Sequence, residues 1–299
     1  MPGEVSRYVT MFETIVVPTD GSENAERAID HAAMLAAAYG ATVHGVYVVN
    51  LTYAGDFESG ADGGVVLESL EREGEKAVDA VRSRCEAAGV DFETTQLEGR
   101  PATRITEYAD AVDADLVVMG THGRSGISRL LLGSVTESVV RNCEREVLTV
   151  PADAPPVEAE YDNVLIATDG SEGSSSATDV GLEVARTFNA TVHGVYVVDE
   201  GVTQTHLIDE LLQQEGRNAI EGVENRAEEA GLEVTTAVLS GSPHDEIATY
   251  ATEHDVDIIV VGSHGKGALE RTLLGSVSER TIRSADRPVL VTRHPEGIV

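Results

Sequence analysis

Short apolar runs alternate along the chain with longer segments whose apolar residues recur every three or four positions. The runs are rich in β-branched residues and predict strands in the first half at residues 14–18, 42–49, 91–97, 115–119 and 147–150. The longer segments predict helices at residues 23–39, 67–88, 102–112 and 134–142. Because strands that alternate with helices pair in parallel, the pattern predicts a doubly wound α/β domain with about five strands.

Two of the predicted strands are apolar throughout. They read LVVMG at residues 116–120 and IIVVG at residues 258–262. Uninterrupted apolar runs are typical of central strands that helices cover on both faces. In such sheets a ligand binds beyond the carboxyl ends of the strands, where the strand order reverses, so we expect a site in the loops after the first and fourth strands.

The chain contains the same pattern twice. Residues 41–49 and 190–198 both read ATVHGVYVV, an offset of 190 − 41 = 149. Further along, Gly120-Thr121-His122-Gly123 recurs as Gly262-Ser263-His264-Gly265, an offset of 262 − 120 = 142, so a loop between residues 50 and 73 differs in length. We expect two repeated domains at residues 11–151 and 161–294, joined by a proline-containing linker at 152–160.

The charge of the chain is strongly acidic. It has 52 acidic and 21 basic side chains, a formal net charge of −31, which argues against binding to a nucleic-acid backbone. It is also 41% apolar, enough for a folded core. At molar salt the screening length falls to about 3 Å, and a dense acidic surface then stays hydrated, so the composition predicts a salt-accumulating host.

The cysteines and the amino terminus favour a cytosolic location. Cys85 and Cys143 have neither the spacing of a zinc site nor that of a disulfide framework, so both are expected to be packing residues. The first residues lack the basic and apolar regions of a signal peptide. No apolar run approaches the ~18 residues that span a bilayer, so we expect no membrane partner.

A glycine-rich stretch follows the fourth predicted strand of each copy. In the first copy nine residues separate Gly123 from Gly133-Ser134, and in the second nine residues separate Gly265 from Gly275-Ser276. The glycines let the backbone approach a ligand closely, and the following helix presents unpaired N–H groups that attract anions. The stretch therefore predicts a phosphate-binding loop.

An alternative explanation applies to part of this stretch. Ser134 with Glu137, and Ser276 with Glu279, match the S-x-x-E capping box of a helix start. Capping accounts for the serine and the glutamate but not for the glycines at a fixed distance upstream, and the two roles are compatible. The spacing is neither that of a Walker A loop nor that of the dinucleotide GxGxxG motif.

These features together resemble the universal stress protein family. The G-x2-G-x9-G-S spacing in both copies, with the surrounding TDGSE and HGVYVV segments, is similar to the nucleotide-binding subgroup of UspA-type proteins. The resemblance covers nearly the whole chain and implies a Rossmann-like, adenine nucleotide α-hydrolase-like fold. It also implies one adenine-nucleotide site per domain, for ATP, ADP or AMP, with or without Mg²⁺.

The resemblance implies a set of binding residues in each copy. In the first they are Pro18, Thr19, Asp20, Val48, Gly120, His122, Gly123, Arg124, Gly133, Ser134 and Val135. In the second they are Ala167, Thr168, Asp169, Val197, Gly262, His264, Gly265, Lys266, Gly275, Ser276 and Val277. The second copy departs from the subgroup where Ala167 replaces the proline of the first copy.

Several of these residues also have simpler explanations. Asp20 and Asp169 fit helix N-caps with a glutamate three residues on, as well as contacts to the ribose and base. Val48 and Val197 fit core positions as well as shelves for adenine. Arg124 and Lys266 fit solvated loop cations as well as phosphate partners.

The histidines give no metal or catalytic signal. His122 and His264 stand beside glycines without a second ligand at helical spacing, so we expect them to contribute backbone amides. His44 and His193 lie within the repeated strand and are expected to be hydrogen-bonded sheet residues. The sequence predicts no metal ion held by the protein alone.

The resulting functional hypothesis is a cytosolic, ATP-binding regulator of the stress response. The alternatives are a slow ATPase and a nucleotide-independent scaffold. No residue set in the predicted site supplies an obvious base and phosphate clamp, so no catalytic residue is assigned. The short apolar fifth strands, 147–150 and 289–292, resemble the edges through which family domains dimerise, so the two copies are expected to pair within one chain as a pseudo-dimer, with or without further self-association.

Overall fold

The computed structural model describes residues 11–50, 63–123, 132–157, 160–201, 206–265 and 274–293. The first repeat contains β1 (Thr14–Pro18), α1 (Glu23–Tyr39), β2 (Thr42–Val49), α3 (Gly63–Ala88), β3 (Phe92–Glu98), α4 (Pro101–Ala111), β4 (Leu116–Gly120), α5 (Ser134–Asn142) and β5 (Glu146–Val150). The second contains β6 (Asn163–Ala167), α6 (Glu172–Phe188), β7 (Thr191–Asp199), α7 (His206–Glu229), β8 (Val234–Gly241), α8 (Pro243–Glu253), β9 (Ile258–Gly262), α9 (Ser276–Ser284) and β10 (Val289–Thr292).

The alternation of strands and helices agrees with the pattern of apolar residues. In the first repeat β1, β2, α1 and α5 have the predicted bounds, and β3, β4, β5 and α4 differ from them by one residue at one or both ends. Helix α3 begins at Gly63, four residues before its predicted start. Its first two residues are glycines, which have a low helix propensity and no apolar periodicity, so the sequence carries no signal for this extension.

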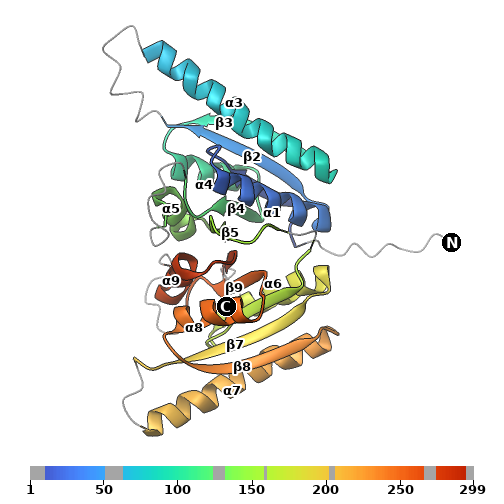
Figure 1. Cartoon of the computed structure of the whole chain (residues 1–299), viewed down its shortest axis with the longest axis vertical. Coiled ribbons are helices and arrows are strands. Elements are labelled where there is room, and N and C mark those ends of the chain that lie inside the picture. Colours follow the sequence, from blue (N-terminus) through green and yellow to red (C-terminus); the bar gives the residue numbers. More distant parts are fainter. Residues whose placement is uncertain are drawn as a thin grey trace, which may run out of the picture.

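The ten strands of the described residues form one sheet. Its order is β3-β2-β1-β4-β5-β10-β9-β6-β7-β8. Within each repeat the pairs are parallel, as predicted, whereas β5 and β10 pair antiparallel, with Leu148 opposite Leu290. Figure 1 shows the two repeats on either side of this seam, with α3 and α7 at the far ends. The expected pairing of the fifth strands within one chain is therefore confirmed.

Helices cover both faces of the sheet. One apolar cluster joins α1, α3, α6 and α7 to one face, and a second joins α4, α5, α8 and α9 to the other. Cys85 lies in the first cluster and Cys143 in the second, both buried and unpaired, as expected of packing residues. Among the described residues, none of the helices combines the length and the apolar character that a bilayer crossing requires.

Polar contacts also join the repeats across the seam. Arg141 of α5 lies 2.7 Å from a carboxylate oxygen of Glu279 in α9, and Arg283 of α9 lies 3.4 Å from Glu137 in α5. On the opposite face, Nδ1 of His31 in α1 forms a 2.8 Å hydrogen bond with the hydroxyl of Tyr161, directly before β6. The repeats therefore pack as one body through both faces.

Candidate functional site

The strand order reverses between β1 and β4 in the first repeat and between β6 and β9 in the second. In the first repeat β1 pairs with β2 on one side and β4 on the other, and their carboxyl ends lie at Pro18 and Gly120. Loops that leave adjacent parallel strands in opposite directions open a crevice between them. We call the crevice after β1 and β4 site 1, and that after β6 and β9 site 2.

The glycine loop of each site is closed by backbone hydrogen bonds. The N–H of Gly133 donates to the carbonyl of Thr121 at 2.8 Å, and the N–H of Gly275 donates to the carbonyl of Ser263 at 2.7 Å. A methyl group added to Gly133 would lie 3.1 Å from the same Thr121 carbonyl oxygen. The absence of a side chain thus lets the start of the helix sit directly against the end of the strand.

In both sites a side-chain hydroxyl in the first turn of the helix forms a hydrogen bond with the end of the strand. Thr136 in α5 donates to the carbonyl of Gly120 at 2.8 Å, and Ser278 in α9 donates to that of Gly262 at 2.6 Å. Both side chains are buried. Neither residue was among the predicted site residues, although a hydroxyl at the same place in both repeats was a usable signal.

The helix after the loop begins one residue earlier than the capping box requires. The N-caps are Gly133 and Gly275, which make no side-chain cap hydrogen bond, and Ser134 and Ser276 are the first helical residues. The capping-box interpretation is therefore wrong, because the loop closure at Gly133 and Gly275 sets the helix start. The N–H groups in the first turn of both helices consequently have no N-cap side chain that accepts from them. Such a helix start favours the binding of anions.

The loop after β1 holds an aspartate without using it as a cap. Ser22 is the N-cap of α1, and its hydroxyl accepts from the N–H of Ala25 at 3.2 Å. Asp20 Oδ1 instead accepts from the N–H of Ser22 at 3.0 Å. Asp169 accepts from Ser171 at 3.0 Å in the same way in site 2. The N-cap explanation of Asp20 and Asp169 is therefore wrong.

The other oxygen of each aspartate reaches the glycine loop. A methyl group added to Gly123 would overlap Oδ2 of Asp20, and one added to Gly265 would lie 2.5 Å from Oδ2 of Asp169. Gly123 and Gly265 are both exposed. The structure therefore brings the predicted aspartate and the predicted loop glycine together in each repeat, at a position that solvent reaches.

Thr19 and Thr168 shape the turn between the strand and the aspartate. Their hydroxyls accept from the N–H groups of Gly21 and Gly170, at 3.2 and 3.1 Å. Both glycines have φ near +75°, a left-handed conformation that a side chain disfavours. Pro18 and Ala167 end the preceding strands, so the prolyl ring in site 1 has no counterpart in site 2.

Apolar side chains lie near the carboxyl ends of β2 and β3 and of β7 and β8, and we call those of each repeat its shelf. Val48 in β2 and Val197 in β7 are partly buried against the second apolar cluster. Leu97 and Leu239 stand opposite them on β3 and β8 and are also partly buried. Neither leucine was predicted, because both strands lie at an edge of the sheet and carry polar as well as apolar residues.

The last predicted apolar residue differs between the sites. Val135, in the first turn of α5, is partly buried against the same cluster as Val48. Val277, its counterpart in α9, is 38% exposed. The valine in the first turn of the helix is therefore more exposed in site 2 than in site 1.

Each loop histidine forms a hydrogen bond with the side chain of the residue before it. Nδ1 of His122 lies 2.9 Å from the hydroxyl of Thr121, and Nδ1 of His264 lies 3.0 Å from that of Ser263. In the described ranges no three His, Cys, Asp or Glu side chains gather as a metal centre requires.

The strand histidines are hydrogen-bonded, as expected, to tyrosines of helices that pack on the sheet. His44 pairs with the hydroxyl of Tyr108 and His193 with that of Tyr250, both at 3.1 Å. Burial lowers the pKa of both histidines.

Some predicted residues lie outside the part of the chain that the structure describes. These are Arg124 and Lys266, the first residues of the two nine-residue spacers. The spacer residues next to the helices are described: Leu132 and Leu274 are buried in the second apolar cluster. Each therefore packs against the sheet directly before its helix begins.

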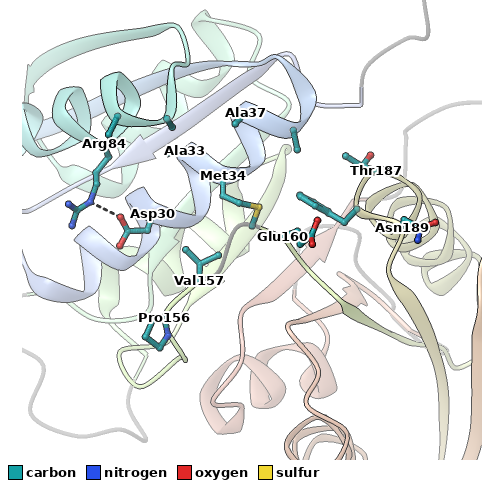
Figure 2. A pocket seen from close by; sticks show the side chains of 14 residues that line it. Asp30, Ala33, Met34, Ala37, Arg84, Pro156, Val157, Glu160, Thr187 and Asn189 are labelled. Atoms are coloured by element: carbon teal, nitrogen blue, oxygen red, sulfur yellow. Dashed lines mark hydrogen bonds and ion pairs between the residues drawn. The ribbon is translucent and has the colours of Figure 1, made fainter.

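A separate cleft of about 890 Å³ lies between the two repeats. Figure 2 shows it between the second half of α1, the linker at Pro156 and Val157, and the end of α6. An ion pair between Arg84 and Asp30, 2.6 Å apart, crosses one side of it. None of the predicted site residues lines this cleft, so it is distinct from sites 1 and 2.

The fold and the paired glycine loops define a class of tandem, doubly wound α/β proteins with a loop and helix start suited to anions in each half. More specifically, the chain belongs to the universal stress protein family, whose family model matches residues 11–151 and 160–293.

Individual relatives agree with this assignment. Universal stress protein MJ0531 of Methanocaldococcus jannaschii is 42% identical over 46% of this chain and 84% of its own length. Universal stress protein Rv2005c of Mycobacterium tuberculosis is 30% identical over 75% of this chain and 78% of its own length. A crystal structure of a universal stress protein from Archaeoglobus fulgidus has the same fold, with a TM-score of 0.69 and 23% identity over 96% of this chain and all of that one.

Proposed function

We propose that this universal stress protein binds one adenine nucleotide in each repeat, ATP in the first instance, and acts as a nucleotide-dependent regulator. The observation that carries the proposal is the same arrangement in both sites: an exposed loop glycine beside an aspartate, followed by a helix whose N-cap is a glycine without a side-chain cap. Such helix starts attract phosphate through their N–H groups and the positive end of the helix dipole.

Different residues of site 1 suit the phosphates, the ribose and the adenine ring of the nucleotide. The N–H groups at Ser134 and Val135, in the first turn of α5, suit the phosphates. Asp20 carries negative charge, which repels phosphate, and its carboxylate oxygens are acceptors that suit the ribose hydroxyls instead. The partly buried Val48 and Leu97 offer an apolar surface for the adenine ring.

The fit to a nucleotide also rests on space. The loop glycine, Gly123, lies where any side chain would overlap the Asp20 carboxylate, and Gly133 lets the helix start close against the strand. The packing requires both of these glycines in site 1, and the same two recur in site 2 as Gly265 and Gly275. Chance composition of the loops therefore does not explain the repeated glycines. ADP, AMP and a magnesium complex of ATP share the features that these groups would recognise.

We also propose that the protein works in the cytosol of a salt-accumulating cell. The net charge of −31 and the apolar content suit a protein that folds in the cytosol of a salt-accumulating cell. There ATP is abundant, and a protein that binds it without an assigned catalytic group is suited to reporting nucleotide state to a partner.

Titration calorimetry with ATP in molar KCl tests the proposal. We expect the wild-type protein to bind two ATP molecules, Gly123→Val and Gly265→Val each to bind one, and the double variant to bind none. Gly222→Val is the matched control, because a Cβ at Gly222 in α7 meets nothing within 4 Å. Absence of binding by the wild-type protein, or two-site binding by the double variant, would refute it.

A further inference from the structure

The two sites differ at one buried position next to the glycine loop. Asn24 is the second residue of α1, and the equivalent residue of α6 is Gly173, at the repeat offset of 173 − 24 = 149. Asn24 is 6% exposed, and its Nδ2 donates to the carbonyl of His122 at 3.0 Å. A side-chain amide from α1 therefore holds the start of the site 1 loop at His122.

This hydrogen bond determines where a loop N–H points. The carbonyl of His122 and the N–H of Gly123 belong to one planar trans peptide, so they point in opposite directions. Because Asn24 draws the carbonyl towards α1, the N–H of Gly123 is directed away from that helix, to the exposed side of the loop. Gly120 makes room for the amide, since a methyl group there would lie 2.8 Å from Asn24 Nδ2.

The burial of Asn24 indicates a specific role for its amide. In the part of the chain that the structure describes, Oδ1 of Asn24 is buried and has no hydrogen-bond partner. A buried acceptor left in this state destabilises the folded protein. An apolar side chain of similar size would avoid that cost, so packing alone does not account for an asparagine here.

Site 2 positions its loop by a different contact. A methyl group added to Gly173 would overlap the carbonyl oxygen of His264, and one added to Gly262 would lie 2.7 Å from the carbonyl oxygen of Gly173. The backbone of α6 thus packs directly on the backbone of the loop. An asparagine has no room at residue 173, just as a glycine has no amide to donate at residue 24.

We infer that residues 24 and 173 are positioning residues that make the two nucleotide sites inequivalent: the phosphate-binding loop of site 1 is set by the Asn24 amide, and that of site 2 by backbone packing on Gly173. The inference rests on the proposed function. It assigns to Asn24 an effect on the phosphates of the nucleotide and none on the adenine shelf, which α1 does not form.

The experiment uses Asn24→Leu, which is similar in size and has no donor, in the Gly265→Val background where only site 1 binds. Binding of ATP and of adenosine is measured separately in molar KCl. We expect the Kd for ATP to rise about tenfold, the effect of losing one hydrogen bond, and the Kd for adenosine to stay the same. Asn24→Ala provides a second, smaller variant in case Asn24→Leu does not fold, and Asn218→Leu on the exposed face of α7 is the control.

The outcomes separate the two proposals. An unchanged Kd for ATP in both Asn24 variants, or an equal loss for ATP and adenosine, would overturn the positioning role of Asn24. Failure of the Gly265→Val parent itself to bind ATP would overturn the proposed function. The reciprocal variant Gly173→Asn in the Gly123→Val background is expected to weaken ATP binding at site 2, and tighter binding there would contradict the inference.

Discussion

The buried hydrogen bond between His31 and Tyr161 makes the stability of the protein depend on pH. His31 is 4% exposed and Tyr161 is 1% exposed, and the bond joins α1 of the first repeat to the entry of the second. Burial, with a smaller contribution from the charge of Arg27, lowers the pKa of His31 from 6.5 to about 4. Between these values the folded protein keeps a neutral imidazole, whereas the unfolded chain binds a proton.

The sign and size of the effect follow from this difference. Because the unfolded state binds more protons, the free energy of unfolding falls as the pH decreases through 6.5 towards 4. A shift from 6.5 to about 4 corresponds to a loss of about 2 kcal/mol at pH 5 and about 3 kcal/mol at pH 4. Above pH 6.5 the contribution of His31 is fully present and constant.

Urea unfolding of the wild-type protein and of His31→Gln at pH 7 and pH 5, in molar KCl, measures this contribution. Glutamine can still bond to Tyr161 but does not titrate. The carboxylates affect both proteins equally, so the informative quantity is the difference between them. We expect His31→Gln to gain about 2 kcal/mol relative to the wild-type protein between pH 7 and pH 5. An unchanged difference, or the same gain in His206→Gln at an exposed histidine, would refute the reasoning.

Three further predictions concern the fold. Leu290→Ala at the seam, opposite the buried Leu148, is expected to lower the free energy of unfolding by about 2–4 kcal/mol, and a loss below about 1 kcal/mol in urea unfolding would contradict the seam packing. Gly181→Ala is expected to lower the free energy of unfolding by about 1–3 kcal/mol in urea unfolding, because its methyl group would lie 2.6 Å from Ile166. The equivalent residue of α1 is already an alanine, Ala32, so Ala32→Gly is not expected to stabilise the protein by relieving such a contact. The thermal midpoint is expected to rise with KCl concentration because the net charge is −31, and a midpoint independent of salt would contradict this.

The strands and helices were predictable because local patterns specify them. Each strand is a short β-branched run and each helix has an apolar spacing of three or four residues, and the repeat supplied a second copy of every pattern. The seam was predictable as an edge-to-edge pairing, since 147–150 and 289–292 are short and apolar. Its antiparallel register, with Leu148 opposite Leu290, became known only from the structure.

The sequence predicted the glycines of the site, whereas most of its hydrogen bonds became known only from the structure. Asp20 and Ser22 are both good N-cap residues, and the choice of Ser22 depends on where the chain leaves β1. Ser134 does not cap α5, because the hydrogen bond that closes the loop at Gly133 makes Gly133 the N-cap. Contacts such as Asn24 with His122 join residues 98 positions apart, and no local pattern reports them.

A crystal structure of the protein grown with ATP in molar KCl tests the central claim most directly. The account predicts a nucleotide in each repeat, with phosphate oxygens within hydrogen-bond distance of the N–H groups at Gly123 and Ser134 in site 1, and at Gly265 and Ser276 in site 2. Well-ordered loops in both repeats without bound ATP, or ATP bound only in the cleft between the repeats, would contradict it.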